Sequence, residues 1–174
     1  MKKFYLIFLN LFVCFIYIGC NTMFKDDELS LPRESYNGNA IRFDGYYYHH
    51  QTNSTSVFFL YRNGIMLGGM SFAGVNIDAV EKEMIKYYYT IENAKYHWRI
   101  FMIRENILEA EGWRSIGWTA KLPVYKFYYN IENDTTLLLI KEINLSDRRE
   151  TQGSEIYHFR QFISKPDSIS KFIK

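Results

Sequence analysis

The sequence predicts a mainly β domain of about eight short antiparallel strands, closed into a barrel or packed as a sandwich, with one helix near residues 78–88. Apolar and polar residues alternate in short runs, as expected of sheets with one buried face. Turn-forming residues separate these runs in pairs, which is typical of β-hairpins. Aromatic residues make up 18% of the chain and supply bulky side chains for a core.

The alternation is clearest between residues 125 and 131, where Tyr125, Phe127 and Tyr129 share one face and Lys126 lies on the other. Strand edges must be hidden, and an antiparallel sheet of this size does so by closing into a barrel or by packing as a sandwich. Eight segments have enough alternation or apolar content to form strands: 40–49, 57–61, 65–72, 98–104, 107–113, 125–131, 135–143 and 155–163.

Three pairs of these segments are joined by short polar connections. Asn63 and Gly64 lie between two apolar runs, which favours a type I′ hairpin turn with positive φ at both residues. Glu105 and Asn106 separate a second pair, and residues 132–134 separate a third. We therefore expect three hairpins in the domain.

One segment has helical rather than strand periodicity. Asp78 and Glu81 have the spacing of a capping box, and Val80, Met84 and Tyr88 follow near helical spacing. The sequence predicts a helix over 78–88, between the third and fourth strands. The tyrosines that end this run could equally belong to a strand, so its end is left open.

The N-terminal residues have the composition of a bacterial secretory signal. Lys2 and Lys3 precede an apolar stretch, 4–18, which is shorter than a membrane-spanning helix. Residues 17–20 (YIGC) resemble a lipobox, which implies cleavage before Cys20 and a lipid on that cysteine. The alternatives are an uncleaved N-terminal membrane anchor and an ordinary signal peptide that is cut at another position. The expected organisation is a signal peptide at 1–19, a lipidated cysteine and flexible linker at 20–39, a β domain at 40–164 and a polar tail at 165–174.

The residues after the cysteine bear on location. Asn21 replaces the aspartate that commonly retains lipoproteins at the inner membrane, so we expect a lipid anchor in the outer membrane. Residues 25–28 (KDDE) resemble the export tag of Bacteroidota surface lipoproteins, and they equally suit a solvated linker. A periplasmic and a surface-exposed position both remain open.

Charge and cysteine content exclude several classes of function. Of 21 basic and 19 acidic residues, cleavage removes two lysines and no acid, so the mature chain has a formal charge of zero. A neutral domain lacks the basic surface that nucleic acid requires, and we expect no nucleic-acid partner. Cys14 leaves with the signal and Cys20 is acylated, which excludes cysteine catalysis, zinc–thiolate sites and iron–sulfur clusters.

No catalytic or metal-binding pattern is present, and we expect no enzyme activity and no cofactor. His49 and His50 are adjacent in a predicted strand and point to opposite faces, so they cannot chelate one metal. Glu109 and Glu111 share one strand face, where parallel side chains do not flank a scissile bond as a glycosidase pair does. The sequence favours a solvent face for these two carboxylates. A hydrolase that combines them with Asp44 is the weakest alternative.

Aromatic residues exceed the needs of a core of this size, so some should line a cavity or lie at the surface. A barrel mouth rimmed by Tyr and Trp could hold a small apolar ligand or stack on a sugar ring. The candidate ligand-contacting residues are Tyr47, Trp98, Trp113, Tyr125 and Phe127.

Several runs resemble those of small uncharacterised Bacteroidota lipoproteins that are described as lipocalin-like. They lie at 43–47 (FDGYY), at 59–64 (FLYRNG) and at 159–162 (FRQF), the last before 165–168 (KPDS). The resemblance implies a lipocalin-like β domain and carries no agreed activity. We expect non-enzymatic binding of a small apolar or glycan ligand or of a protein partner, and a structural or assembly role in the envelope is the alternative.

Overall fold

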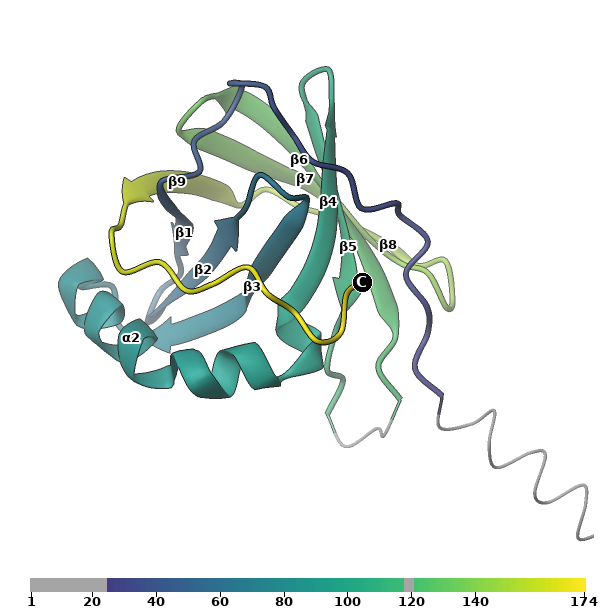
Figure 1. Ribbon diagram of the computed structural model, residues 1–174, viewed down its shortest axis with the longest axis horizontal. Coiled ribbons are helices and arrows are strands. Elements are labelled where there is room, and N and C mark those ends of the chain that lie inside the picture. Colours follow the sequence, from purple (N-terminus) through teal and green to yellow (C-terminus); the bar gives the residue numbers. More distant parts are fainter. Residues whose placement is uncertain (1–24, 118–120) are drawn as a thin grey trace, which may run out of the picture.

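A computed structural model describes residues 25–117 and 121–174 of the chain. In this part of the chain, eight antiparallel strands form a closed barrel, and a short ninth strand, β8, extends the sheet beyond β7 (Figure 1). The prediction of a mainly β, lipocalin-like domain is confirmed, and the choice between barrel and sandwich is settled in favour of the barrel. The strands are β1 (Gly45–His50), β2 (Ser54–Leu60), β3 (Ile65–Ala73), β4 (Trp98–Arg104), β5 (Ile107–Trp113), β6 (Val124–Asn133), β7 (Thr136–Asn144), β8 (Glu150–Gln152) and β9 (Ile156–Gln161).

The barrel closes through pairings between strands that are distant in the sequence. Strands β1 to β7 pair in chain order, and β9 inserts between β7 and β1. The predicted alternation in β6 is confirmed, because Phe127, Tyr129 and Ile131 are buried. The inward side chains form one cluster: Ile41, Tyr47, Phe58, Leu60, Met66, Phe101, Leu108, Ala110, Phe127, Tyr129, Ile131, Leu137 and Leu139.

A second apolar cluster lies outside the barrel, beneath helix α2 (Ile77–Asn93). The helix runs along the outer side of the sheet beside β3 (Figure 1) and buries Val80, Met84 and Ile91 there. The helix is longer than predicted and includes all three consecutive tyrosines. Its cap is Asn76, whose side chain accepts hydrogen bonds from two backbone N–H groups of the first turn, so the predicted capping box at Asp78 is wrong.

The first hairpin also differs from its predicted form. The turn is closed by a hydrogen bond from the Gly64 N–H to the Tyr61 carbonyl oxygen, and Gly64 has a φ of +78°. Asn63 does not adopt a positive φ, so the turn is not type I′. A three-residue loop that ends in a left-handed glycine is the next most common hairpin connection.

One end of the barrel is closed by residues before β1. The expected strand over 40–49 begins only at Gly45, and the preceding residues cross the end of the barrel, where Ile41 joins the interior cluster. The Tyr47 hydroxyl fixes this crossing, because it accepts from the Arg42 N–H at 3.1 Å and donates to the Asp134 carbonyl oxygen at 2.9 Å. This end is therefore filled by side chains.

Residues 25–39 lie against the barrel, which differs from the expected flexible linker. The Trp113 Nε1–H donates to the Asp27 carbonyl oxygen at 2.7 Å, and Leu31 is buried in the outer cluster. The ionic residues of this stretch are also paired, Asp26 with Lys95 at 2.7 Å. Cys20 and the signal segment lie outside the described residues.

The C-terminal residues pack across the outside of the barrel as well, as the yellow segment in Figure 1 shows. Ile173 is buried in the outer cluster, and the Tyr61 hydroxyl donates to the Pro166 carbonyl oxygen at 2.9 Å. Lys165 donates to the carbonyl oxygens of Phe43 and Leu60 at 2.7 and 2.5 Å. The segment is polar in sequence, but its few apolar residues hold it in place.

Candidate ligand cavity

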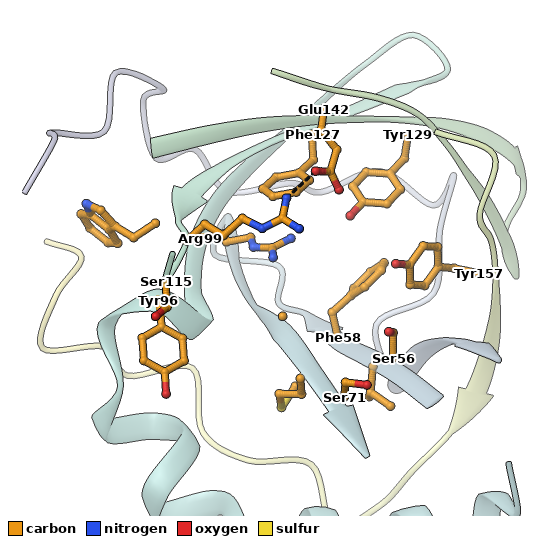
Figure 2. Close-up of a pocket in the computed structure, with 15 residues that line it drawn as sticks. Ser56, Phe58, Ser71, Tyr96, Arg99, Ser115, Phe127, Tyr129, Glu142 and Tyr157 are labelled. Atoms are coloured by element: carbon orange, nitrogen blue, oxygen red, sulfur yellow. Dashed lines mark hydrogen bonds and ion pairs between the residues drawn. The ribbon is translucent and has the colours of Figure 1, made fainter. Parts of the chain in front are cut away.

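A cavity of about 310 Å³ lies at the end of the barrel opposite the closed one. Its walls come from the start of β2, the end of β3, the start of β4 and the end of β5, which antiparallel pairing brings to one end of the barrel. Figure 2 shows the side chains gathered around this space. The lining residues include Ser56, Phe58, Ser71, Tyr96, Arg99, Trp113, Arg114, Ser115, Phe127, Tyr129, Glu142 and Tyr157.

The floor of the cavity is aromatic. The ring centroid of Phe58 lies 5.0 Å from that of Tyr157 and 5.6 Å from that of Tyr129. Burial raises the pKa of Tyr157 to about 12, so its hydroxyl is neutral over the physiological range and can donate a hydrogen bond. Hydroxyl groups of Ser56 and Ser71 lie on the wall formed by β2 and β3 (Figure 2).

Arg99 extends into the cavity from β4 (Figure 2). Its guanidinium carbon lies 4.0 Å from the centroid of the Phe127 ring, which is the geometry of a cation–π contact. The residue is only 8% exposed. Tyr129 also lines the cavity; burial raises its pKa, and the nearby charge of Arg99 partly opposes that increase.

A second arginine, Arg114, lies at the rim and is neutralised. It donates to a carboxylate oxygen of Glu142 at 2.6 Å, the ion pair drawn as a dashed line in Figure 2. Arg114 also lies over the ring of Tyr125, 5.0 Å from its centroid. This pair narrows one side of the cavity and adds no net charge to it.

The candidate aromatic residues from the sequence fall in different places. Phe127 lines the cavity, and Tyr125 packs on Phe127 with a centroid distance of 6.4 Å. Trp113 borders the cavity at the end of β5, but its side chain lies in the outer cluster, where its Nε1–H donates to the Asp27 carbonyl oxygen. Tyr47 is buried at the closed end of the barrel. Trp98 is buried under α2, where its Nε1–H donates to the Glu92 carbonyl oxygen at 2.8 Å. The structure thus brings the rings of two of the five, Phe127 and Tyr125, to the cavity region.

Sequence reasoning missed the remaining lining residues, Arg99 above all. The available signal was the alternation in β4, which places Arg99 on the same face as the buried Phe101. A charged residue at an inward position of a strand is uncommon, because burial of an unpaired charge is costly.

The carboxylates of the hydrolase alternative do not converge. Glu111 is fully buried on the outer side of β5, where the backbone N–H of Ser30 donates to it and the Ser30 hydroxyl donates at 2.9 Å. The solvent face predicted for this residue is therefore wrong, because the N-terminal segment covers it. Glu109 pairs with Lys126 at 2.7 Å, and Asp44 pairs with Arg42 at 2.6 Å before β1. None of the three carboxylates lines the cavity.

Histidines make local contacts in the sheet. His97 lies beside the β3 bulge, where its Nδ1 is 2.9 Å from the Gly68 carbonyl oxygen, and burial lowers its pKa. His50 contacts the Thr55 hydroxyl at 2.9 Å through its Nδ1. Within residues 25–117 and 121–174, no three His, Cys, Asp or Glu side chains gather closely enough to hold a metal ion.

Comparison with protein-family models, with curated proteins and with solved structures finds no match to this chain. In the described part of the chain, no helix has both the length and the apolar content needed to cross a bilayer. The fold and the cavity therefore carry the functional argument.

Proposed function

We propose that this chain is a lipid-anchored, non-catalytic binding protein of the outer membrane, which holds a small ligand in the mouth of its barrel. The observation that carries the proposal is the cavity of about 310 Å³ at the open end of the barrel, beside the interior cluster of buried side chains. Small-molecule sites are concave, mostly apolar and supplied with a few convergent polar groups. In this cavity the rings of Phe58, Phe127 and Tyr157 supply the apolar surface, and the serine hydroxyls and Arg99 supply the polar groups.

The nature of the walls supports binding of an apolar or sugar ring. Phe58 and Tyr157 form a continuous aromatic surface at the cavity floor, which suits stacking. Ser56 and Ser71 face one another across the β2–β3 pair and offer hydroxyls that both donate and accept. The charged pair at the rim, Arg114 with Glu142, is already engaged and leaves these groups to meet the ligand.

The lipid anchor is part of the same proposal and rests on the N-terminal sequence pattern that ends at Cys20. Two or three acyl chains would hold the protein at a membrane, since each buried CH₂ contributes about 0.8 kcal/mol. A binding domain fixed in this way would capture its ligand at the envelope.

Mass spectrometry of the chain extracted from its native outer membrane tests both parts. We expect a diacyl or triacyl adduct on Cys20 and a retained small molecule in one-to-one ratio with the protein. A Ser56→Phe variant should fill the cavity and lose the small molecule, because the new ring occupies its volume. Ser164→Phe, at an exposed position outside the cavity, is the matched control and should retain it.

The two parts fail separately. An unmodified Cys20 would overturn the anchor and leave the cavity argument intact. Equal retention of a small molecule by the two phenylalanine variants, or no retained molecule in the wild-type chain, would count against ligand binding in the barrel and favour a role for the outer surface.

A further inference from the structure

Arg99 is a charged side chain inside the barrel. Its pairing partner on the neighbouring strand β5 is Gly112, and it shares the inward face of β4 with Phe101. More than nine-tenths of the residue is buried. Arginine is seldom buried to this extent unless a carboxylate or another anion accompanies it.

The barrel interior supplies only part of the counter-charge and hydrogen-bond acceptors that the Arg99 guanidinium requires. Phe127 covers one face of it, and its charge acts to lower the pKa of Tyr129, against the effect of burial. Among the described residues, no carboxylate forms an ion pair with Arg99, and its Nε has no hydrogen-bond partner. Glu142, which also lines the cavity, is bonded to Arg114. The Nε donor of this buried cation is therefore left without a partner among the described residues.

The neighbouring strands are built to leave room for this side chain. A Cβ atom at Gly112 would overlap Cγ of Arg99, so only glycine allows the arginine to lie where it does. On the other side, Gly69 has a φ of +70°, and a Cβ there would approach the Arg99 NH2 atom to 3.1 Å. Gly112 of β5 and Gly69 of β3, the strands on either side of β4, thus border Arg99. Glycine weakens the interior of a strand, so its presence at both positions is a cost that makes room for this side chain.

We propose that the ligand of the barrel carries one carboxylate, which Arg99 binds, on a small apolar or aromatic body that rests against Phe58 and Tyr157. This inference rests on the proposed binding function and specifies the class of ligand. Arg99 is the one uncompensated charge among the described lining residues, because Arg114 and Glu142 neutralise each other, so the site matches a single negative charge. A planar carboxylate also fits the donor geometry of a guanidinium. The cavity volume of about 310 Å³ lies at the lower end for ligand sites and suits a small molecule.

The test compares an acid with its neutral amide in the full chain, held in detergent micelles. The probes are 4-phenylbutyrate and 4-phenylbutanamide, which share one body and differ in charge. Binding is followed by NMR through the Nε–H resonance of Arg99 and the backbone amides of residues 69–71. We expect the acid to bind at least about tenfold more tightly than the amide, because charge-assisted hydrogen bonds are about twice as strong as neutral ones.

Substitutions then assign the preference to Arg99. Arg99→Met should bring the acid down to the affinity of the amide, and Arg99→Lys, which keeps the charge, should retain a preference for the acid. Arg104→Met is the matched control, because it removes the same charge from an exposed position at the far end of β4 and should change neither affinity.

The outcomes separate the two claims. Equal affinities of acid and amide for the wild-type chain, or an acid preference that survives in Arg99→Met, would overturn the role of Arg99 and leave ligand binding standing. If neither probe shifts the cavity resonances of the wild-type chain, both the carboxylate site and the proposed binding function fail for small aromatic ligands.

Discussion

At the scale of single residues, polar groups in apolar surroundings account for much of the molecule's behaviour. Lys165 of the C-terminal segment illustrates this. Its ammonium group lies 4.0 Å from the centroid of the Tyr61 ring and donates to the backbone carbonyl oxygens of Phe43 and Leu60 in the barrel. Burial lowers its pKa to about 8. Arg99 is likewise a charged group that has lost most of the water around it, since it is only 8% exposed.

The lowered pKa of Lys165 predicts a pH dependence of stability. The folded chain releases this proton near pH 8, whereas the unfolded chain holds it to about pH 10.4. The free energy of unfolding should therefore rise as the pH increases from 8 to about 9.5, because the cost of burying the charge disappears. Urea unfolding of the wild-type chain and of Lys165→Met checks this. A wild-type minus variant difference that stays constant or falls over this range would contradict it.

Gly64 and Gly74 form a matched pair for a prediction on backbone strain. Both have positive φ, +78° and +89°, but a Cβ at Gly64 would overlap the Glu34 carbonyl oxygen, whereas nothing lies within 4 Å of one at Gly74. Gly74→Ala should lower the free energy of unfolding by about 1–2 kcal/mol, the cost of the left-handed conformation. Gly64→Ala should cost clearly more. If urea unfolding shows that both variants lose the same free energy of unfolding, the overlap with Glu34 does not destabilise the fold.

At the scale of elements, period-two alternation located strands well and helical spacing located α2. The sequence could not define how either end of the helix is made. Asn76, two residues before the predicted cap, accepts from the backbone N–H groups of Asp78 and Ala79. Asp78 instead pairs with Arg160 of β9 at 2.8 Å, a contact that sequence spacing does not reveal.

The observed cap predicts the effect of substitution there. Asn76→Ala should lower the free energy of unfolding by about 1 kcal/mol, because two N–H groups of the first turn lose their acceptor. Asn76→Ser, which keeps an acceptor oxygen, should recover most of that loss. Chemical denaturation of the three chains measures both effects. An alanine variant as stable as the wild type would show that the cap contributes nothing.

Other elements were beyond sequence reasoning because their contacts are distant in the chain. The local alternation around Ile41 predicts a strand, yet Ile41 closes the barrel end because the N–H of its neighbour Arg42 donates to the Asp134 carbonyl oxygen in the β6–β7 turn. The alternation in β5 predicts a solvent face for Glu111, but Ser30, 81 positions away in the chain, covers it. The inward position of Arg99 follows from the same alternation that places Phe101, but the sequence does not show that a cavity lies beside it.

At the scale of the whole molecule, the barrel is one part of a larger packed unit. The outer cluster combines residues of α2, of the sheet and of both terminal segments, including Leu31 and Ile173. Terminal segments are usually poorly ordered unless contacts hold them. The C-terminal segment is mostly polar, but its few apolar residues pack into the outer cluster and hold the segment against the sheet.

This arrangement predicts that the last residues stabilise the fold. A chain that ends at Lys171 lacks Phe172 and Ile173 and exposes part of the outer cluster, so its melting temperature should fall by several degrees, as expected for a loss of about 1–3 kcal/mol. A chain that lacks only Lys174, which is exposed, is the control and should melt like the wild type. Identical melting temperatures for all three chains would contradict a structural role for this segment.

The central claim is that the open end of the barrel holds a small ligand. The most direct measurement is a crystal structure of the chain purified from its native membrane without added ligand. We expect electron density for one small molecule between Phe58, Tyr157 and Arg99, with its acidic end at the guanidinium. A cavity that contains only ordered water, or that has collapsed so that side chains fill it, would contradict the account.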